Sequence, residues 1–350
     1  MSILSHSRGP SGLAWRVRRA ARSLLLLPLG LLGVVAPALA DAPTVVVSIK
    51  PIHSLVASVM QGVGEPVLLV DGNASPHSWT LKPSQAAALS GAGLVVWIGE
   101  GMESYLASPV GSLVPEERML ELSELPTIML LPVREGGVWE PHAHDGEAHA
   151  DDEHADAEHT EDEHADEDHA EEGHEHGGYD PHLWLDPGNA VAIARAVADR
   201  LIALDPANET AYETNLAALT DAIGRLDAAT AATLAPMHDV PYIVFHDAYQ
   251  YFEQHYGLAG VGSITLDPEQ APGAARLAAI RARLAEADVV CAFAEPQVDT
   301  GLLETAVEGT DVRIATLDPE GLAIEPGPAL YGTLFEGLVR TMAECLSPPG

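Results

Sequence analysis

Three histidines stand where a metal ion could be held between two parts of the chain. His77 follows a predicted strand at 66–70, His182 follows an acidic segment, and His246 directly follows a predicted strand at 242–245. In α/β proteins ligands bind beyond the carboxyl ends of the strands, and neutral imidazole is a common zinc ligand. Taken singly, each histidine is better explained as a residue that caps or packs an element. Together they predict a metal site shared by the two halves of the chain.

A second set of histidines lies in one acidic segment, residues 140–178. It contains nine histidines and seventeen acids, with no Lys, Arg or large aliphatic residue, so we expect it to be disordered. Six of the histidines recur at every fifth position, a step of about 140° on a helix, so they would not share a helix face. The segment suits the collection of several weakly held metal ions, although a solubilising linker could have the same composition. Its histidines are His142, His144, His149, His154, His159, His164, His169, His174 and His176.

The elements that must position these residues alternate between short apolar runs and helical stretches. The runs are β-branched and nearly continuous, as expected for parallel strands buried on both faces. The strand candidates are residues 45–49, 66–70, 94–98 and 128–131 in the first half, and 242–245, 261–265, 289–293 and 313–316 in the second. The helix candidates between them include 52–61, 84–89 and 274–287. The predicted fold class is therefore α/β, with a parallel sheet in each of two lobes.

The middle of the chain is predicted to be helical. Residues 189–237 are rich in Ala and Leu and are interrupted at Asp205-Pro206. The second of the two predicted helices, from about 208 to 234, would be about 40 Å long, enough to bridge two lobes. We therefore expect an N-terminal lobe at 41–188 that carries the insertion 140–178, a helical connector at 189–237, and a C-terminal lobe at 238–350. A ligand cleft between the lobes follows.

Residues 1–40 have the composition of a cleaved signal peptide. Five arginines precede or flank the start of an apolar run at 24–32, and Ala38-Leu39-Ala40 offers a cleavage pattern. No later segment is apolar and long enough for a membrane helix. Removal of 1–40 takes away five arginines and no acids, which changes the formal charge from −35 to −40. We expect an exported protein that repels nucleic acid and anionic membranes and attracts cations.

The chain contains two cysteines, Cys291 and Cys345. In an oxidising compartment an isolated pair favours a disulfide, which would close a loop of about 55 residues and stabilise the fold by about 4 kcal/mol in the chain-entropy model. A thiolate metal site is the alternative, but the spacing matches no zinc-finger pattern.

Six stretches spread over the chain carry a specific family resemblance. They are IKP at 49–51, PHSWTLKPS at 76–84, HLWL at 182–185, FHDAY at 245–249, FAEPQ at 293–297 and TLDP at 316–319. In these stretches, in its acidic His-rich insertion and in its C-terminal cysteine pair, the chain resembles the zinc-binding solute receptors of ABC importers. These are ZnuA-type proteins within the wider zinc/manganese receptor family.

This resemblance implies two (β/α)4 lobes joined by a long rigid backbone helix, with metal in the cleft between them. The metal ligands it implies are His77 and His182 from the first lobe and His246 from the second. Asp318 matches an aspartate ligand of the manganese branch, whereas Pro76 stands where some zinc members have a glutamate. The fourth ligand is thus expected to be Asp318 or water.

Two neighbouring residues are of interest beside this ligand set. Glu295 is expected to support a ligand or the fold rather than to bind zinc, and His53 could either reach the cleft or lie on a helix surface. Zinc affinity is expected to fall below about pH 6 as the imidazoles become protonated.

The function implied by the resemblance is that of a periplasmic receptor that delivers Zn²⁺ to the membrane permease of an ABC importer. We expect a monomer that binds no nucleic acid and is not an enzyme. The alternatives are a periplasmic zinc buffer or chaperone, or a manganese or iron receptor. A zinc hydrolase is disfavoured because the sequence has neither a His-Glu-x-x-His helix nor a Gly-x-Ser-x-Gly elbow.

Overall fold

The structure is a computed structural model that describes residues 42–72, 75–77, 79–134, 178–265 and 273–348. The predicted signal peptide at 1–40 and the nine histidines of the acidic insertion lie outside these ranges.

The first sheet has four parallel strands in the order β2-β1-β3-β4. The central strands are runs of large apolar residues that are buried on both faces, as expected for a parallel sheet covered by helices. A proline in the first turn helps to begin both α1 and α2. The elements are β1 (Val45–Val47), α1 (Lys50–Val59), β2 (Val67–Leu68), α2 (Pro83–Gly91), β3 (Leu94–Trp97), α3 (Ser104–Leu113) and β4 (Met119–Glu121).

The strand predicted at 128–131 is wrong, because the fourth strand of this sheet is β4, Met119–Glu121. The backbone of Leu131 makes different hydrogen bonds. Its N–H donates to the Tyr251 hydroxyl at 3.0 Å, and its carbonyl accepts from the Asp180 N–H at 2.8 Å. An aliphatic run was thus mistaken for a strand, although it forms an irregular segment that contacts the second half of the chain.

The second sheet repeats the topology of the first, with four parallel strands in the order β6-β5-β7-β8. Within the described residues each sheet has its chain-first strand in the interior, flanked by its second and third strands. The predicted α/β fold class with two four-stranded lobes is confirmed. The elements are β5 (Tyr242–His246), α6 (Gln250–Tyr256), β6 (Gly260–Thr265), α7 (Ala274–Glu286), β7 (Cys291–Ala294), α8 (Gly301–Val307) and β8 (Arg313–Thr316).

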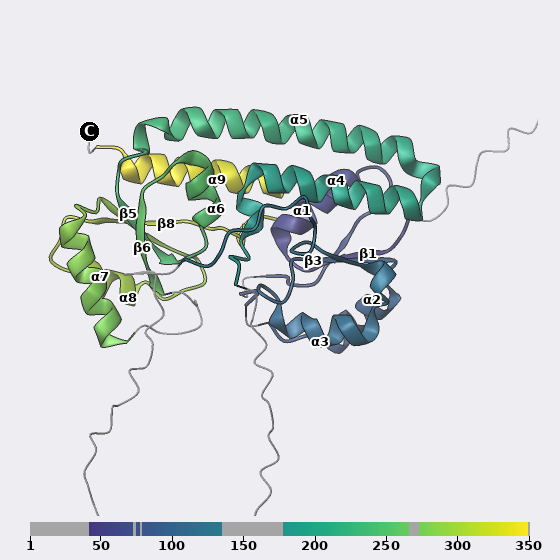
Figure 1. The fold of residues 1–350 in the computed structure, drawn as a ribbon, viewed down its shortest axis with the longest axis horizontal. Helices are drawn as coiled ribbons and strands as arrows, with labels where there is room; N and C mark the ends of the chain where they lie inside the picture. Colours follow the sequence, from purple (N-terminus) through teal and green to yellow (C-terminus); the bar gives the residue numbers. More distant parts are fainter. Residues whose placement is uncertain (1–41, 73–74, 78, 135–177, 266–272, 349–350) are drawn as a thin grey trace, which may run out of the picture. The chain divides into compact units, whose positions relative to one another are not determined.

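Three long helices connect the two sheets: α4 (Pro187–Leu204), α5 (Glu209–Leu234) and α9 (Leu330–Leu346). Figure 1 shows α5 running along the whole side of the described fold, with α4 under one end of it and α9 under the other. Helix α5 contacts α1 of the first half and both α6 and α9 of the second. The predicted bridging helix agrees with α5 to within one residue, whereas α9 was not predicted. Among the described residues, no helix combines the length and the apolar character needed to cross a bilayer.

One hydrophobic core extends through both halves. It includes Val96 of β3, Ala194 of α4, Tyr212 of α5, Val244 of β5 and Phe335 of α9, all fully buried. Two smaller clusters cover the outer faces of the sheets. Because the shared core packs the two sheets onto the same helices, it holds their carboxyl ends in a defined relation. Side chains at these ends can therefore form a single site.

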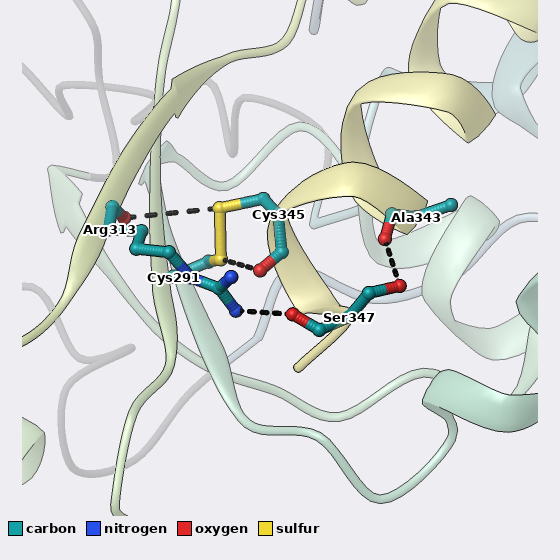
Figure 2. The surroundings of a disulfide bond; sticks show 5 residues. All are labelled: Cys291, Arg313, Ala343, Cys345 and Ser347. Atoms are coloured by element: carbon teal, nitrogen blue, oxygen red, sulfur yellow. Dashed lines mark hydrogen bonds between the residues drawn. A yellow bond between two sulfur atoms is a disulfide. The ribbon is translucent and has the colours of Figure 1, made fainter. Parts of the chain in front are cut away.

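A disulfide joins Cys291 to Cys345, with a Cα–Cα distance of 6.1 Å, which confirms the predicted pairing. Figure 2 shows that it links the start of β7 to the last turn of α9. Close by, the Arg313 side chain donates a hydrogen bond of 2.8 Å to the carbonyl of Ser347. With both thiols in the disulfide, a thiolate metal site is excluded.

Candidate metal centre

His77, His182 and His246 converge on one point. One ring nitrogen from each lies within 4.8 Å of the others, and among the described residues this is the group whose geometry could hold a metal ion. The ring centroids are separated by 5.1 Å for His182 and His246, 5.6 Å for His77 and His182, and 5.9 Å for His77 and His246. His77 comes from the turn after β2, His182 from the residue before a short 3-10 turn, and His246 from the end of β5.

The imidazole of His182 is held by a carboxylate two residues earlier in the chain. Asp180 Oδ1 lies 2.7 Å from His182 Nδ1 and also accepts the backbone N–H of His182 at 3.0 Å. An ionised carboxylate only accepts hydrogen bonds, so Nδ1 carries the proton. The lone pair is then on Nε2, which faces the centre of the cluster. Asp180 was not predicted from the sequence, although its Asp-x-His spacing was a usable signal.

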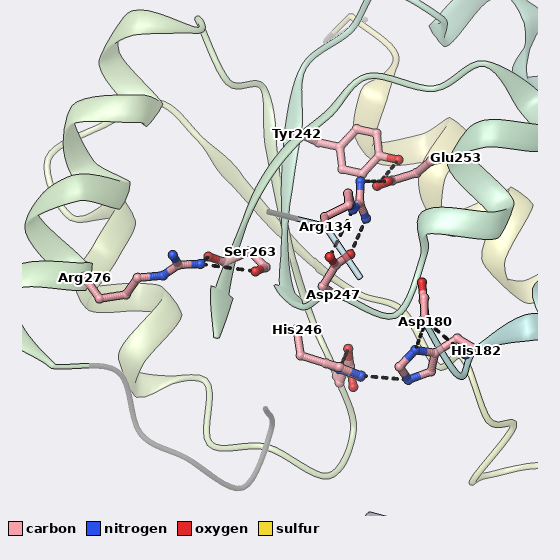
Figure 3. Close-up of polar contacts among 10 residues, drawn as sticks. Arg134, Asp180, His182, Tyr242, His246, Asp247, Glu253, Ser263 and Arg276 are labelled. Atoms are coloured by element: carbon pink, nitrogen blue, oxygen red, sulfur yellow. Dashed lines mark hydrogen bonds and ion pairs between the residues drawn. The ribbon is translucent and has the colours of Figure 1, made fainter. Parts of the chain in front are cut away.

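The imidazole of His246 is held by a carboxylate from the neighbouring strand. Glu295 directly follows β7, and its Oε1 lies 2.6 Å from His246 Nδ1. Its second carboxylate oxygen accepts a hydrogen bond of 3.0 Å from Gln297. The Nε2 atom of each ring is therefore directed away from its carboxylate. The Nε2 atoms of His182 and His246 lie 3.2 Å apart. Figure 3 shows the contact between them. Carboxylates behind ligating histidines are a recurrent feature of metal sites because they fix the tautomer and the ring orientation.

The two buried histidines differ in protonation. Burial lowers the pKa of His182 well below its usual value, and the charge of His246 lowers it further. Burial also acts to lower the pKa of His246, but the charge and hydrogen bond of Glu295, helped by Asp247 and Asp180, outweigh it and raise that pKa above 6.5. Burial raises the pKa of Asp180 to about 6. Before metal binds, His182 thus loses its extra proton more readily than His246.

Asp318 lies outside the cluster of three histidines within the described residues. Its carboxylate instead accepts backbone N–H groups of the turn that follows, from Gly321 at 2.8 Å and Glu320 at 3.2 Å. Two side chains of the first half of the chain hold this turn. The Trp184 indole N–H donates to the carbonyl of Pro319 at 2.9 Å, and the Lys50 ammonium donates to that of Leu322 at 2.7 Å.

His53 takes no part in the cluster. Its side chain is buried and its Nε2 lies 3.1 Å from the carbonyl oxygen of Pro66. Of the two alternatives left open for His53, the structure shows neither a place in the cluster nor an exposed helix surface, because α1 packs against the first sheet and the long helices.

A two-lobed α/β protein with a three-histidine centre, in which two rings are buried and backed by carboxylates, has the architecture of a metal-binding receptor. The model of the ZnuA family, described as zinc-uptake complex component A, periplasmic, matches residues 45–345. The chain belongs to this family. Its relatives are named as components of uptake systems, so the prediction of a non-enzymatic protein is confirmed.

Two curated relatives illustrate the match. The high-affinity zinc uptake system protein ZnuA of Brucella suis biovar 1 is 46% identical over 305 residues, which cover 87% of this chain and 91% of that protein. The protein of the same description from Paracoccus denitrificans is 43% identical over 325 residues, covering 93% and 98%. A solved ZnuA crystal structure, 24% identical, superimposes with a TM-score of 0.67 over 88% of this chain and 100% of the other.

Proposed function

We propose that the chain is a high-affinity zinc receptor of the periplasm that delivers Zn²⁺ to the membrane permease of an ABC-type importer. The observation that carries the proposal is the cluster of three imidazoles that converge on one point, two of them buried and held through Nδ1 by a carboxylate. Neutral nitrogen ligands of this kind suit zinc better than manganese, which prefers oxygen. The names of the curated relatives support uptake as the purpose of the binding.

His77, His182 and His246 are the proposed ligands, and Asp318 or water completes a tetrahedral set. Ligation by Asp318 requires its carboxylate to exchange the N–H groups of Gly321 and Glu320 for the metal. The histidines of the insertion at 140–178 are proposed to bind further zinc ions weakly and to raise the local zinc concentration. The receptor is proposed to act as a monomer after removal of residues 1–40.

A metal competition experiment tests the proposal. Zinc-free protein is titrated with Zn²⁺ in the presence of a competing chelator, and the titration is repeated with Mn²⁺. We expect one tight site for zinc and much weaker binding of manganese, together with a rise in melting temperature when zinc is added. Equal or tighter binding of manganese would favour a manganese receptor, and several equivalent weak zinc sites without a tight one would favour a zinc buffer.

A further inference from the structure

The segment that leads to His182 is paired with the segment that carries Arg134. The two segments are residues 131–134 and 178–180, here called the paired segments. Pro132 and Tyr179 form an antiparallel bridge, the Asp180 N–H donates to the Leu131 carbonyl at 2.8 Å, and the Val133 N–H donates to the Gly178 carbonyl at 3.3 Å. A displacement of Arg134 therefore moves the paired segments, and with them His182, which lies two residues beyond.

The guanidinium of Arg134 extends from the paired segments to the other half of the site. It forms a two-pronged ion pair with Asp247, including a 3.0 Å bond from Nε to Oδ2, and a 2.6 Å ion pair with Glu253 of α6. Asp247 directly follows His246. The Tyr242 hydroxyl donates to the remaining oxygen of Glu253 at 2.9 Å. Figure 3 shows this cluster above His246 and His182 in the view, with Asp247 next to His246 in the chain.

We propose that Arg134 is a positioning residue of the metal centre, which sets the separation of His182 and His246 by joining the paired segments to the end of β5. The inference rests on the proposed function, because it concerns the affinity and the ligand geometry of the same zinc site. Arg134 itself is not a metal ligand in this proposal. It acts through Asp247 on one ligand and through the paired segments on the other.

The surroundings require arginine at this place. The ion pairs are largely enclosed, with 19% of the Arg134 side chain exposed and 8% and 5% of the Asp247 and Glu253 side chains. A planar guanidinium can bond two carboxylates in fixed geometry, whereas an ammonium is a point charge that cannot reproduce the fork. Gly260 confirms how closely Glu253 is held, because a Cβ there would lie 2.1 Å from the Glu253 carboxylate.

A second contact keeps the two halves together without Arg134. The Tyr251 hydroxyl donates to the Asp180 carbonyl at 2.8 Å and accepts the Leu131 N–H at 3.0 Å. Both acceptor and donor belong to the paired segments. Replacement of Arg134 by lysine is therefore expected to loosen the geometry of the zinc site while the fold persists.

The test compares Arg134→Lys with the wild-type chain and with Arg281→Lys, which alters an exposed arginine 3.7 Å from Glu308. Zinc affinity is measured by chelator competition, and the visible absorption spectrum of Co²⁺ bound in place of zinc reports the ligand geometry. Arg134→Lys is expected to weaken zinc binding about 10-fold, as for other groups behind metal ligands, and to shift the Co²⁺ spectrum. Arg281→Lys is expected to leave both unchanged.

A second variant removes the charges together, so that no buried acid loses its partner. Arg134→Met, Asp247→Asn and Glu253→Gln are combined, and the same weakening and spectral shift are expected. Wild-type zinc affinity and spectrum in Arg134→Lys and in the triple variant, even with lowered melting temperatures, would overturn the inference and leave the zinc receptor intact. Lack of a tight zinc site in the wild-type chain would instead overturn the proposed function.

Discussion

His182 and His246 are both buried and both hydrogen-bonded through Nδ1 to a carboxylate, but the two carboxylates have different origins. Asp180 lies two residues before His182, in the same loop. Glu295 lies 49 residues beyond His246 and reaches it because β7 pairs with β5. The contact of Asp180 with His182 is local in the sequence, whereas the contact of Glu295 with His246 depends on the pairing of β5 with β7. The proposed metal centre thus combines a histidine that its own loop orients with a histidine that the tertiary fold orients.

The two histidines also differ in charge before metal binds. The pKa of His182 is lowered by burial and by the neighbouring His246, whereas Glu295 raises the pKa of His246 against the effect of burial. Metal binding requires an unprotonated nitrogen. If both rings bind zinc, protons compete with the metal more strongly at His246 than at His182.

The largest effect is expected from removal of either imidazole. His182→Ala and His246→Ala should each weaken tight zinc binding by more than the about 10- to 100-fold typical of groups behind the ligands, as measured by chelator competition. His238→Ala is the matched control, because His238 is exposed and outside the cluster. Retention of wild-type affinity by either cluster variant would remove that histidine from the ligand set.

The next largest loss of zinc affinity is expected from substitution of the two carboxylates that contact the histidines. Asp180→Asn and Glu295→Gln each keep an oxygen that can accept from Nδ1 but remove the charge that strengthens the hydrogen bond. Each should weaken zinc binding about 10-fold, while Glu308→Gln, at an exposed carboxylate, should have no effect. A loss in Glu295→Gln alone would show that the local support of His182 does not contribute to affinity.

The pH dependence separates the two histidines further. Because the pKa of His246 is raised, protons compete with zinc from above pH 6.5 downward, a higher onset than the pH 6 inferred from the sequence. Because the pKa of His182 is lowered, its protonation weakens zinc binding only at lower pH. Zinc affinity measured from pH 5 to 8 should therefore fall with decreasing pH, and Glu295→Gln should move the onset to lower pH. An identical onset in that variant would contradict the assignment.

The pairing of His246 with Glu295 also affects the stability of the zinc-free fold. A histidine whose pKa is raised on folding stabilises the fold fully below its unfolded value, and this contribution is lost as the pH rises through the raised value. The stabilisation by His246 and Glu295 should therefore decrease above about pH 6.5.

The smallest effect on zinc is expected from the disulfide. Cys291 stands at the start of β7 and Glu295 follows its end, about 13 Å away at the usual rise of a strand. Cys291→Ser with Cys345→Ser should lower the free energy of unfolding by about 4 kcal/mol in the chain-entropy model, measured by denaturant unfolding, with zinc affinity unchanged. Weaker zinc binding would show that the disulfide helps to place Glu295.

The sequence pattern predicted most of the strands and the bridging helix, because buried parallel strands are continuous apolar runs and α5 is a long stretch free of strand formers. Residues 313–316 agree with β8, and 208–234 with α5 to within one residue. The pattern failed at β4, a short strand that ends on Glu121, because pairing with β3 rather than composition makes it a strand. It also failed at α9, whose apolar face was not recognised.

The site was predicted unevenly for a similar reason. The positions of His77, His182 and His246 at the ends of elements could be read from the chain. The pairing of Glu295 with His246 depends on the order of β5 and β7, and the contacts of Arg134 with Asp247 and Glu253 join residues more than 100 positions apart. No local pattern encodes these contacts. The same holds for Asp318, whose carboxylate bonds its own turn in the described structure.

The central claim is that the three histidines, and not the acidic insertion, form the tight zinc site. Its most direct test is a chelator-competition titration of the zinc-free protein from residue 41 onward beside a variant that lacks residues 140–178. We expect one tight zinc site of equal affinity in both proteins, with additional weak binding only when the insertion is present. Loss of the tight site together with the insertion would contradict it and would make the protein a zinc buffer.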